Sequence, residues 1–85
     1  KNMNKQLVLG VSKTIKAIRK SKQVSQEELA EKSSLDRTYI SGVERGVRNI
    51  TLDSLEWIIY GLDVELIDFI DELKVHIQAC DKPFQ

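Results

Sequence analysis

Three observations predict an all-α fold for this 85-residue chain. It contains one proline, Pro83, and four glycines, and both residue types disrupt helix interiors. Apolar residues recur at spacings of three and four in five successive segments, which is the period of an amphipathic helix. Good N-cap residues precede three of these segments. Because the chain is long enough for only one core, we expect a single domain over residues 1–85, with its core at about residues 7–79.

The first predicted helix covers Leu7–Lys20, and its lysines and arginine occupy the remaining faces. Four branched apolar residues share one face at helical spacing: Val8, Val11, Ile15 and Ile18. This face is the first candidate for the core.

Two short helices follow. One begins after Ser25, where Glu28 three residues later completes a capping box in which each side chain binds a free backbone N–H group. It should end near Ser33. The next begins after Asp36, a good N-cap residue, and stops near Gly46, because glycine accepts the left-handed conformation found at helix ends.

The last two helices are strongly apolar. One begins after Thr51, and Gly61 is its expected end. The other covers Glu65–Ala79, with Leu66, Ile70, Leu73 and Ile77 on an inward stripe and Ile67, Phe69 and Val75 away from it. So much apolar surface indicates either deep packing or burial against a second subunit. Trp57 and Tyr60 fit the core or an interface equally well.

The net charge is zero, but the charges are unevenly distributed. Residues 1–50 contain 11 Lys+Arg against 5 Asp+Glu, whereas residues 51–85 contain 2 against 8. The first half is therefore suited to face a polyanion and the second to face away from it. This asymmetry favours nucleic acid as a partner.

Other site types find little support in the sequence. Cys80 is the only cysteine, so no internal disulfide can form, and His76 with Cys80 and Asp81 is a poor set of metal ligands. We expect no metal and no cofactor. No apolar run is long enough for a membrane span, and Leu7–Val11 is too short for a signal peptide, so the expected location is the cytoplasm. No catalytic motif is present, which argues against an enzyme.

Residues 26–45, QEELAEKSSLDRTYISGVER, have the organisation of a helix-turn-helix motif. Two short helices are separated by a turn of about three or four residues, and Ala30 supplies a small side chain where they cross. If Ile40 and Val43 face the core, five residues of the second helix face outward: Arg37, Thr38, Ser41, Gly42 and Arg45.

The chemistry of these residues suits duplex DNA. Recognition helices present their N-terminal residues to base edges, and Arg37 can bind guanine O6 and N7 with two hydrogen bonds. Tyr39 can contact a phosphate or a thymine methyl group. Gln26, at a helix N-terminus, can bind a phosphate. Arg48 and Asn49 follow in a loop placed to meet the backbone, and Arg48 can also reach a base or the minor groove.

The motif resembles the helix-turn-helix of the phage Cro and repressor (XRE-like) family over about residues 7–70. Within that family, residues 36–51, DRTYISGVERGVRNIT, are similar to controller proteins of bacterial restriction–modification systems, which have a matching Asp-Arg-Thr-Tyr-Ile-Ser segment and an Arg-Asn pair after the second helix. The resemblance implies a five-helix, repressor-like domain and a sequence-specific transcriptional regulator. Such a regulator binds a pseudo-palindromic DNA operator as a homodimer.

The resemblance also implies roles for individual residues. Base contacts fall to Arg37, Thr38, Arg48 and, in support, Tyr39; phosphate contacts fall to Gln26, Ser41 and Asn49. Arg19 and Glu44 align with a structural ion pair. The last two helices form the dimer, for which the expected interface residues are Trp57, Tyr60, Ile67, Phe69, Ile70 and Leu73. Ser34 occupies a turn position usually held by glycine, at a cost of ~1 kcal/mol.

Alternatives remain open within and outside this class. An antitoxin or a prophage repressor would have the same fold, although the chain shows no long disordered tail that could wrap a toxin. A protein-interaction module that has lost DNA binding is the alternative of a different class, and the basic first half argues against it. RNA polymerase is a candidate further partner of a DNA-bound regulator.

Overall fold

The computed structural model describes residues 5–80 and contains, in that part of the chain, five helices and no strand. The helices are α1 (Gln6–Ser21), α2 (Gln26–Ser33), α3 (Arg37–Glu44), α4 (Leu52–Leu62) and α5 (Leu66–Cys80). All five predicted helices are thus present. The outer parts of the predicted domain, residues 1–4 and 81–85, lie outside the described residues. None of the described helices has both the length and the apolar character needed to cross a bilayer.

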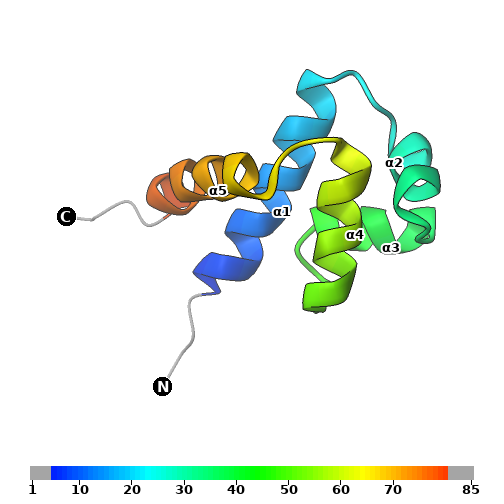
Figure 1. The fold of residues 1–85 in the computed structure, drawn as a ribbon. Coiled ribbons are helices and arrows are strands. Elements are labelled where there is room, and N and C mark those ends of the chain that lie inside the picture. The colour runs from blue at the N-terminus through cyan, green and yellow to red at the C-terminus, as the bar shows by residue number, and fades with distance from the viewer. Residues whose placement is uncertain (1–4, 81–85) are drawn as a thin grey trace.

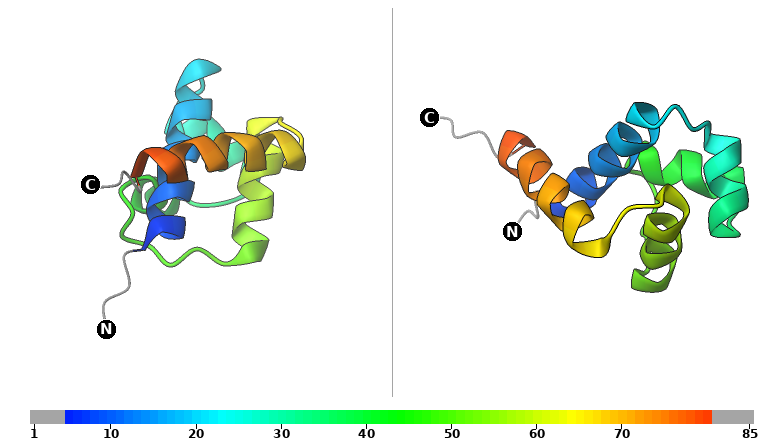
Figure 2. Two further views of the ribbon diagram at one scale, coloured as in Figure 1. Left: turned by 90° about the vertical axis from the view of Figure 1, so that its left-hand side faces the viewer. Right: turned by 45° about the horizontal axis from the view of Figure 1, so that its top comes forward.

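The long helix α1 separates two groups of helices (Figure 1). It packs against α5 on one side, while α2, α3 and α4 gather on the other, with α4 mainly against α2. Two further views show α5 crossing α1 (Figure 2). One apolar cluster joins all five helices: Val11, Ile15, Ile18, Leu29, Ala30, Ile40, Val43, Ile58, Ile59, Leu62 and Phe69. The described residues therefore share one core.

The starts of α2 and α4 follow the expected capping chemistry. Ser25 Oγ accepts from the N–H group of Glu28 at 3.0 Å, and the Ser25 N–H group donates to Glu28 Oε1 at 2.8 Å. Thr51 Oγ1 accepts from the N–H group of Ser54 at 3.0 Å. Asp36 is the N-cap residue of α3, but its side chain makes no capping hydrogen bond. These contacts explain why the starts of α2 and α4 could be read from the sequence.

Gly61 does not end α4, contrary to the prediction. The helix continues to Leu62, and Asp63 adopts the left-handed conformation with φ 60°. A Cβ atom on Gly61 would lie 3.1 Å from Leu29 Cδ1 and 3.2 Å from the backbone nitrogen of Ser33. The glycine therefore lets α4 approach α2 closely, which is a packing requirement and not a stop signal.

The predicted inward stripe of α5 was also partly wrong. Leu66 and Ile70 are 53% and 45% exposed, whereas Phe69 is 1% exposed. A Cβ atom on Gly10 of α1 would lie 2.7 Å from Ile77 Cγ1. The contact face of α5 therefore consists of Phe69, Leu73 and Ile77, which are spaced four positions apart, and this leaves Leu66 and Ile70 uncovered.

Candidate nucleic-acid interface

The helix α3 is anchored by one side and open on the other. Ile40 and Val43 are 0% and 2% exposed and hold the helix against the core. Arg37 and Thr38, in its first turn, are both exposed, and Tyr39 is half-buried. The structure thus presents the N-terminal turn of α3 to the surroundings, as a recognition helix must.

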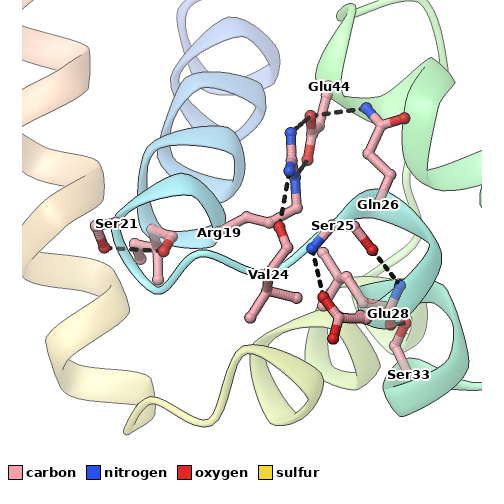
Figure 3. Close-up of polar contacts among 10 residues, drawn as sticks. Arg19, Ser21, Val24, Ser25, Gln26, Glu28, Ser33 and Glu44 are labelled. Atoms are coloured by element: carbon pink, nitrogen blue, oxygen red, sulfur yellow. Dashed lines mark hydrogen bonds and ion pairs between the residues drawn. The ribbon is translucent and has the colours of Figure 1, made fainter.

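A buried polar network fixes the orientation of α3 relative to α1 and α2 (Figure 3). Arg19 Nε donates to Glu44 Oε2 at 2.6 Å, and a second guanidinium nitrogen donates to Glu44 Oε1 at 2.9 Å. The same guanidinium donates to the carbonyl of Val24 at 2.9 Å. The hydrogen bond to Glu44 raises the pKa of Arg19 above its ordinary value. The expected ion pair is present, and it ties α1 to α3 without occupying the outer surface.

Gln26 takes part in this network as well as lying at the N-terminus of α2. Its Nε2 atom donates to Glu44 Oε1 at 3.0 Å, which orients the side chain (Figure 3). An amide nitrogen has a second hydrogen, and the first N–H groups of a helix have no intrahelical partner. This end of α2 therefore retains donors that suit an anion.

Two of the residues predicted to contact DNA, Gln26 and Arg37, line one shallow hollow. It has a volume of about 400 Å³ and is lined by Arg19, Ser25, Gln26, Glu27 and Arg37. The hollow joins the N-terminal ends of α2 and α3. The structure thus brings Gln26 and Arg37, eleven positions apart in the sequence, to the same part of the surface.

The second part of the candidate interface lies at the other end of α3. Arg48 and Asn49 are exposed in the loop after the helix. The guanidinium carbon of Arg48 lies 5.3 Å from the centroid of the Tyr39 ring, a cation–π contact. Ser41 is half-buried, and its Oγ atom accepts from Arg45 at 2.6 Å. A hydroxyl group that accepts one hydrogen bond can still donate its own hydrogen to a phosphate.

Gly42 was expected to face outward, and this was wrong. It is buried, because the side chain of Arg48 lies across it. Glycine inside a short helix is costly, and this cost was the available signal that a close contact occurs here. The partner in that contact comes from a loop, so helical periodicity alone does not identify it.

The candidate dimer surface consists of apolar side chains on α4 and α5. Trp57 and Tyr60 are 53% and 72% exposed and form an edge-to-face pair with centroids 6.3 Å apart. Ile67 is 65% exposed and Leu73 is half-buried. Phe69 belongs to the core of its own chain and has no surface to offer a second copy, so its predicted interface role was wrong. Leu52 and Leu66 are exposed too and were not predicted.

An outward-facing helix with arginine and threonine in its first turn, held by a second helix across a short turn, defines a helix-turn-helix protein of the DNA-binding class. The model of the helix-turn-helix family matches residues 15–69, which is more than half of the chain. The chain belongs to this family.

More specific relatives are controller proteins. Control protein C.BamHI of Bacillus amyloliquefaciens is 48% identical over 58 residues, covering 67% of this chain and 72% of the relative. Control protein C.MunI of Mycoplasma sp is 41% identical over 61 residues, covering 71% and 82%. The crystal structure of the restriction–modification controller protein C.Esp1396I matches with a TM-score of 0.82 at 52% identity, covering 84% of this chain and 93% of that one. Within the helix-turn-helix family, the chain therefore belongs to the controller proteins of restriction–modification systems.

Proposed function

We propose that this chain regulates transcription within a restriction–modification system by binding operator DNA as a homodimer. The observation that carries the proposal is the open side of α3, where Arg37 and Thr38 are exposed while the opposite side is anchored in the core. The related controller protein C.Esp1396I has been solved as a tetramer on its natural 35 base-pair operator and on duplexes of 25 and 19 base pairs.

The base-reading residues are Arg37, Thr38, Tyr39 and Arg48. Arginine can bind guanine through two hydrogen bonds, and the threonine methyl group can contact thymine. C.Esp1396I has also been solved with its consecutive arginine, threonine and tyrosine substituted in turn. This chain has that tripeptide once, at residues 37–39. The order of residues therefore supports the same readout surface here.

The phosphate-binding residues are Gln26, Ser41 and Asn49. Gln26 is oriented by Glu44 and lies at the N-terminus of α2, where the helix dipole favours an anion. Contacts of this kind set the register of a protein on the duplex but carry no sequence information. Ser41 and Asn49 extend the same role to the middle of α3 and to the loop after it.

The homodimer forms through the uncovered apolar side chains Trp57, Tyr60, Ile67 and Ile70, with Leu73 at its edge. Large exposed aromatic and aliphatic groups are typical of the centre of a subunit interface. A two-fold dimer of helix-turn-helix units places its recognition helices about one turn of DNA apart, so the operator is a pseudo-palindrome. The acidic second half of the chain then faces away from the phosphates.

The biological setting follows from this activity. In this proposal the chain is a single DNA-binding domain that acts in the cytoplasm as a regulator and not as an enzyme, and operator binding requires no cofactor or metal. RNA polymerase is a second partner once the regulator is bound beside a promoter.

The test is a gel-shift titration of the dimer with DNA from upstream of its own gene, against a duplex of shuffled sequence. We expect at least ~1000-fold tighter binding to the upstream DNA and a steep fall in affinity with salt. Arg37→Ala is expected to reduce that preference about 5- to 150-fold, whereas Lys74→Ala, which removes an exposed cation from α5, keeps it. Equal affinity of the unaltered protein for both duplexes would refute the proposal.

A further inference from the structure

We infer that Gly42 is a positioning residue for DNA recognition: it leaves open the space through which the Arg48 side chain crosses α3 to stack on Tyr39. The inference rests on the proposed function of Arg48. It assigns a role to a residue that contacts no DNA itself, and it explains why a glycine occupies the interior of an eight-residue helix.

The backbone at the end of α3 brings residue 48 to this place. The N–H group of Val47 donates to the carbonyl of Gly42 at 3.1 Å, and that of Gly46 donates to the carbonyl of Val43 at 3.0 Å. Gly46 has φ 75°. This pattern is a Schellman motif, which closes a helix end and fixes the direction of the chain leaving it. Arg48 therefore starts directly beside the turn of α3 that contains Gly42.

The side chain of Arg48 then runs back along the helix. A Cβ atom on Gly42 would lie 2.7 Å from Arg48 Cγ, 3.3 Å from Nε and 3.6 Å from Cδ. Tyr39 precedes Gly42 by three residues and thus lies on the same side of the helix, one turn closer to its start. The guanidinium carbon sits 5.3 Å from the Tyr39 centroid. The positive charge of Arg48 is thus held near the first turn of α3, although its backbone lies beyond the last.

Any other side chain at position 42 would occupy this path. A separation of 2.7 Å between two carbon atoms is far below van der Waals contact, and Arg48 is the flexible member of the pair. Alanine is a better helix former than glycine, so Gly42→Ala should fold while displacing Arg48 from Tyr39. The charge remains on the protein, but its position relative to Arg37 and Thr38 changes. Gly42 therefore determines where the loop arginine is presented to DNA.

The experiment is a double-mutant cycle on operator affinity and base preference. We expect Gly42→Ala to weaken operator binding about tenfold, Arg48→Ala to do so by at least as much, and the double variant to be no weaker than Arg48→Ala alone. Arg45→Ala provides the matched background, because it removes a neighbouring arginine that binds Ser41. In that background the effect of Gly42→Ala should persist. Wild-type affinity of Gly42→Ala, or an undiminished effect in the Arg48→Ala background, would overturn the inference.

A second measurement does not depend on DNA. Because the Arg48 guanidinium carbon lies 5.3 Å from the Tyr39 centroid, the ring is expected to shift the NMR signals of the Arg48 side chain. Gly42→Ala should remove this shift while thermal unfolding remains cooperative. Tyr39→Phe keeps an aromatic ring and should keep the shift, whereas Tyr39→Leu should abolish it. Unchanged Arg48 signals in Gly42→Ala would refute the positioning role. If the unaltered protein bound no operator, the proposed function would fail, and these spectra alone would decide whether Gly42 positions Arg48.

Discussion

The two halves of this small protein expose different kinds of surface. In α2 and α3, no large apolar side chain is strongly exposed, and the outer residues are polar or charged: Glu27, Glu28, Glu31 and Lys32 on α2, and Arg37 and Thr38 on α3. In α4 and α5, by contrast, seven large apolar side chains are exposed: Leu52, Trp57, Tyr60, Leu66, Ile67, Ile70 and Val75. All the residues proposed to contact DNA on the first surface come from a single chain. The second is costly in water until something apolar covers it.

The halves also differ in how their geometry is held. The helix-turn-helix half is oriented by directional polar contacts, centred on Arg19 and Glu44. Among the described residues, every buried side-chain nitrogen or oxygen has a hydrogen-bond partner. The other half is held by apolar packing of α5 on α1 and of α4 on α2. DNA recognition needs fixed directions, whereas dimer formation needs area, so each half has the kind of contact that suits its task.

The largest expected effect comes from the polar network. Glu44→Ala should lower the free energy of unfolding by ~3–5 kcal/mol, because it leaves the buried guanidinium of Arg19 without its carboxylate. The side chains of this pair are only 10% and 3% exposed. Urea denaturation followed by circular dichroism, at one fixed protein concentration, measures the change. Glu31→Ala, which alters an exposed residue of α2, is the control and should cost less than ~0.5 kcal/mol. Equal losses in both variants would remove the contrast between the halves.

The next largest effect concerns the apolar half. Ile70→Asp should weaken the dimer by ~2–4 kcal/mol, because dimer formation would bury an unpaired carboxylate. Ile70 is 45% exposed in the single chain, so the variant should still fold. Sedimentation over a range of concentrations measures the dissociation constant. Gln78→Asp adds the same charge to an exposed position of α5 and should leave the dimer intact. An unchanged dimer in Ile70→Asp would move the interface away from this face.

Local signals in the sequence predicted much of the fold. The start of α2 was predictable because Ser25 and Glu28, three positions apart in the sequence, form a capping box. The left-handed turn at Ser34, with φ 58°, was expected from the helix-turn-helix resemblance. Helix positions and the open side of α3 follow from the same short-range periodicity. Features of this kind need no knowledge of distant parts of the chain.

What could not be predicted depends on contacts between distant elements. The buried side of α5 is set by where Leu73 and Ile77 meet Gly10, more than sixty positions earlier, so Phe69 turned out to be core. Gly61 was mistaken for a helix end because its partner lies in α2. Gly42 was placed on the outer surface because Arg48, which covers it, follows the helix in a loop. In each case a glycine marked a close approach to a residue outside its own helix.

The third-largest expected effect comes from a variant that tests the DNA-binding surface directly. Arg37→Ala should weaken operator binding by ~1–3 kcal/mol and relax base preference at the contacted position, because a bidentate contact to guanine is lost. Binding titrations against operators with single base changes measure both quantities. Asn49→Ala, which removes a proposed phosphate contact, is the companion variant and should weaken all duplexes by similar factors. An Arg37→Ala variant that kept the full base preference would contradict the readout role of α3.

The smallest effect lies in the turn between α2 and α3. Ser34 has φ 58° and ψ 36°, a left-handed conformation that is strained for residues with a Cβ atom. Ser34→Gly should remove this strain, and the greater freedom of glycine in the unfolded chain offsets part of the gain, which leaves ~0.5 kcal/mol of added stability. The melting temperature should rise by ~2–4 °C. The matched variant is Gly46→Ala, at φ 75°. Its new Cβ atom would also lie 3.1 Å from Leu9 Cδ2, so this variant should have a lower melting temperature.

Operator affinity and dimer formation should not change in Ser34→Gly, because this exposed turn belongs to neither surface. A change in either property would show that the two halves are coupled through the turn.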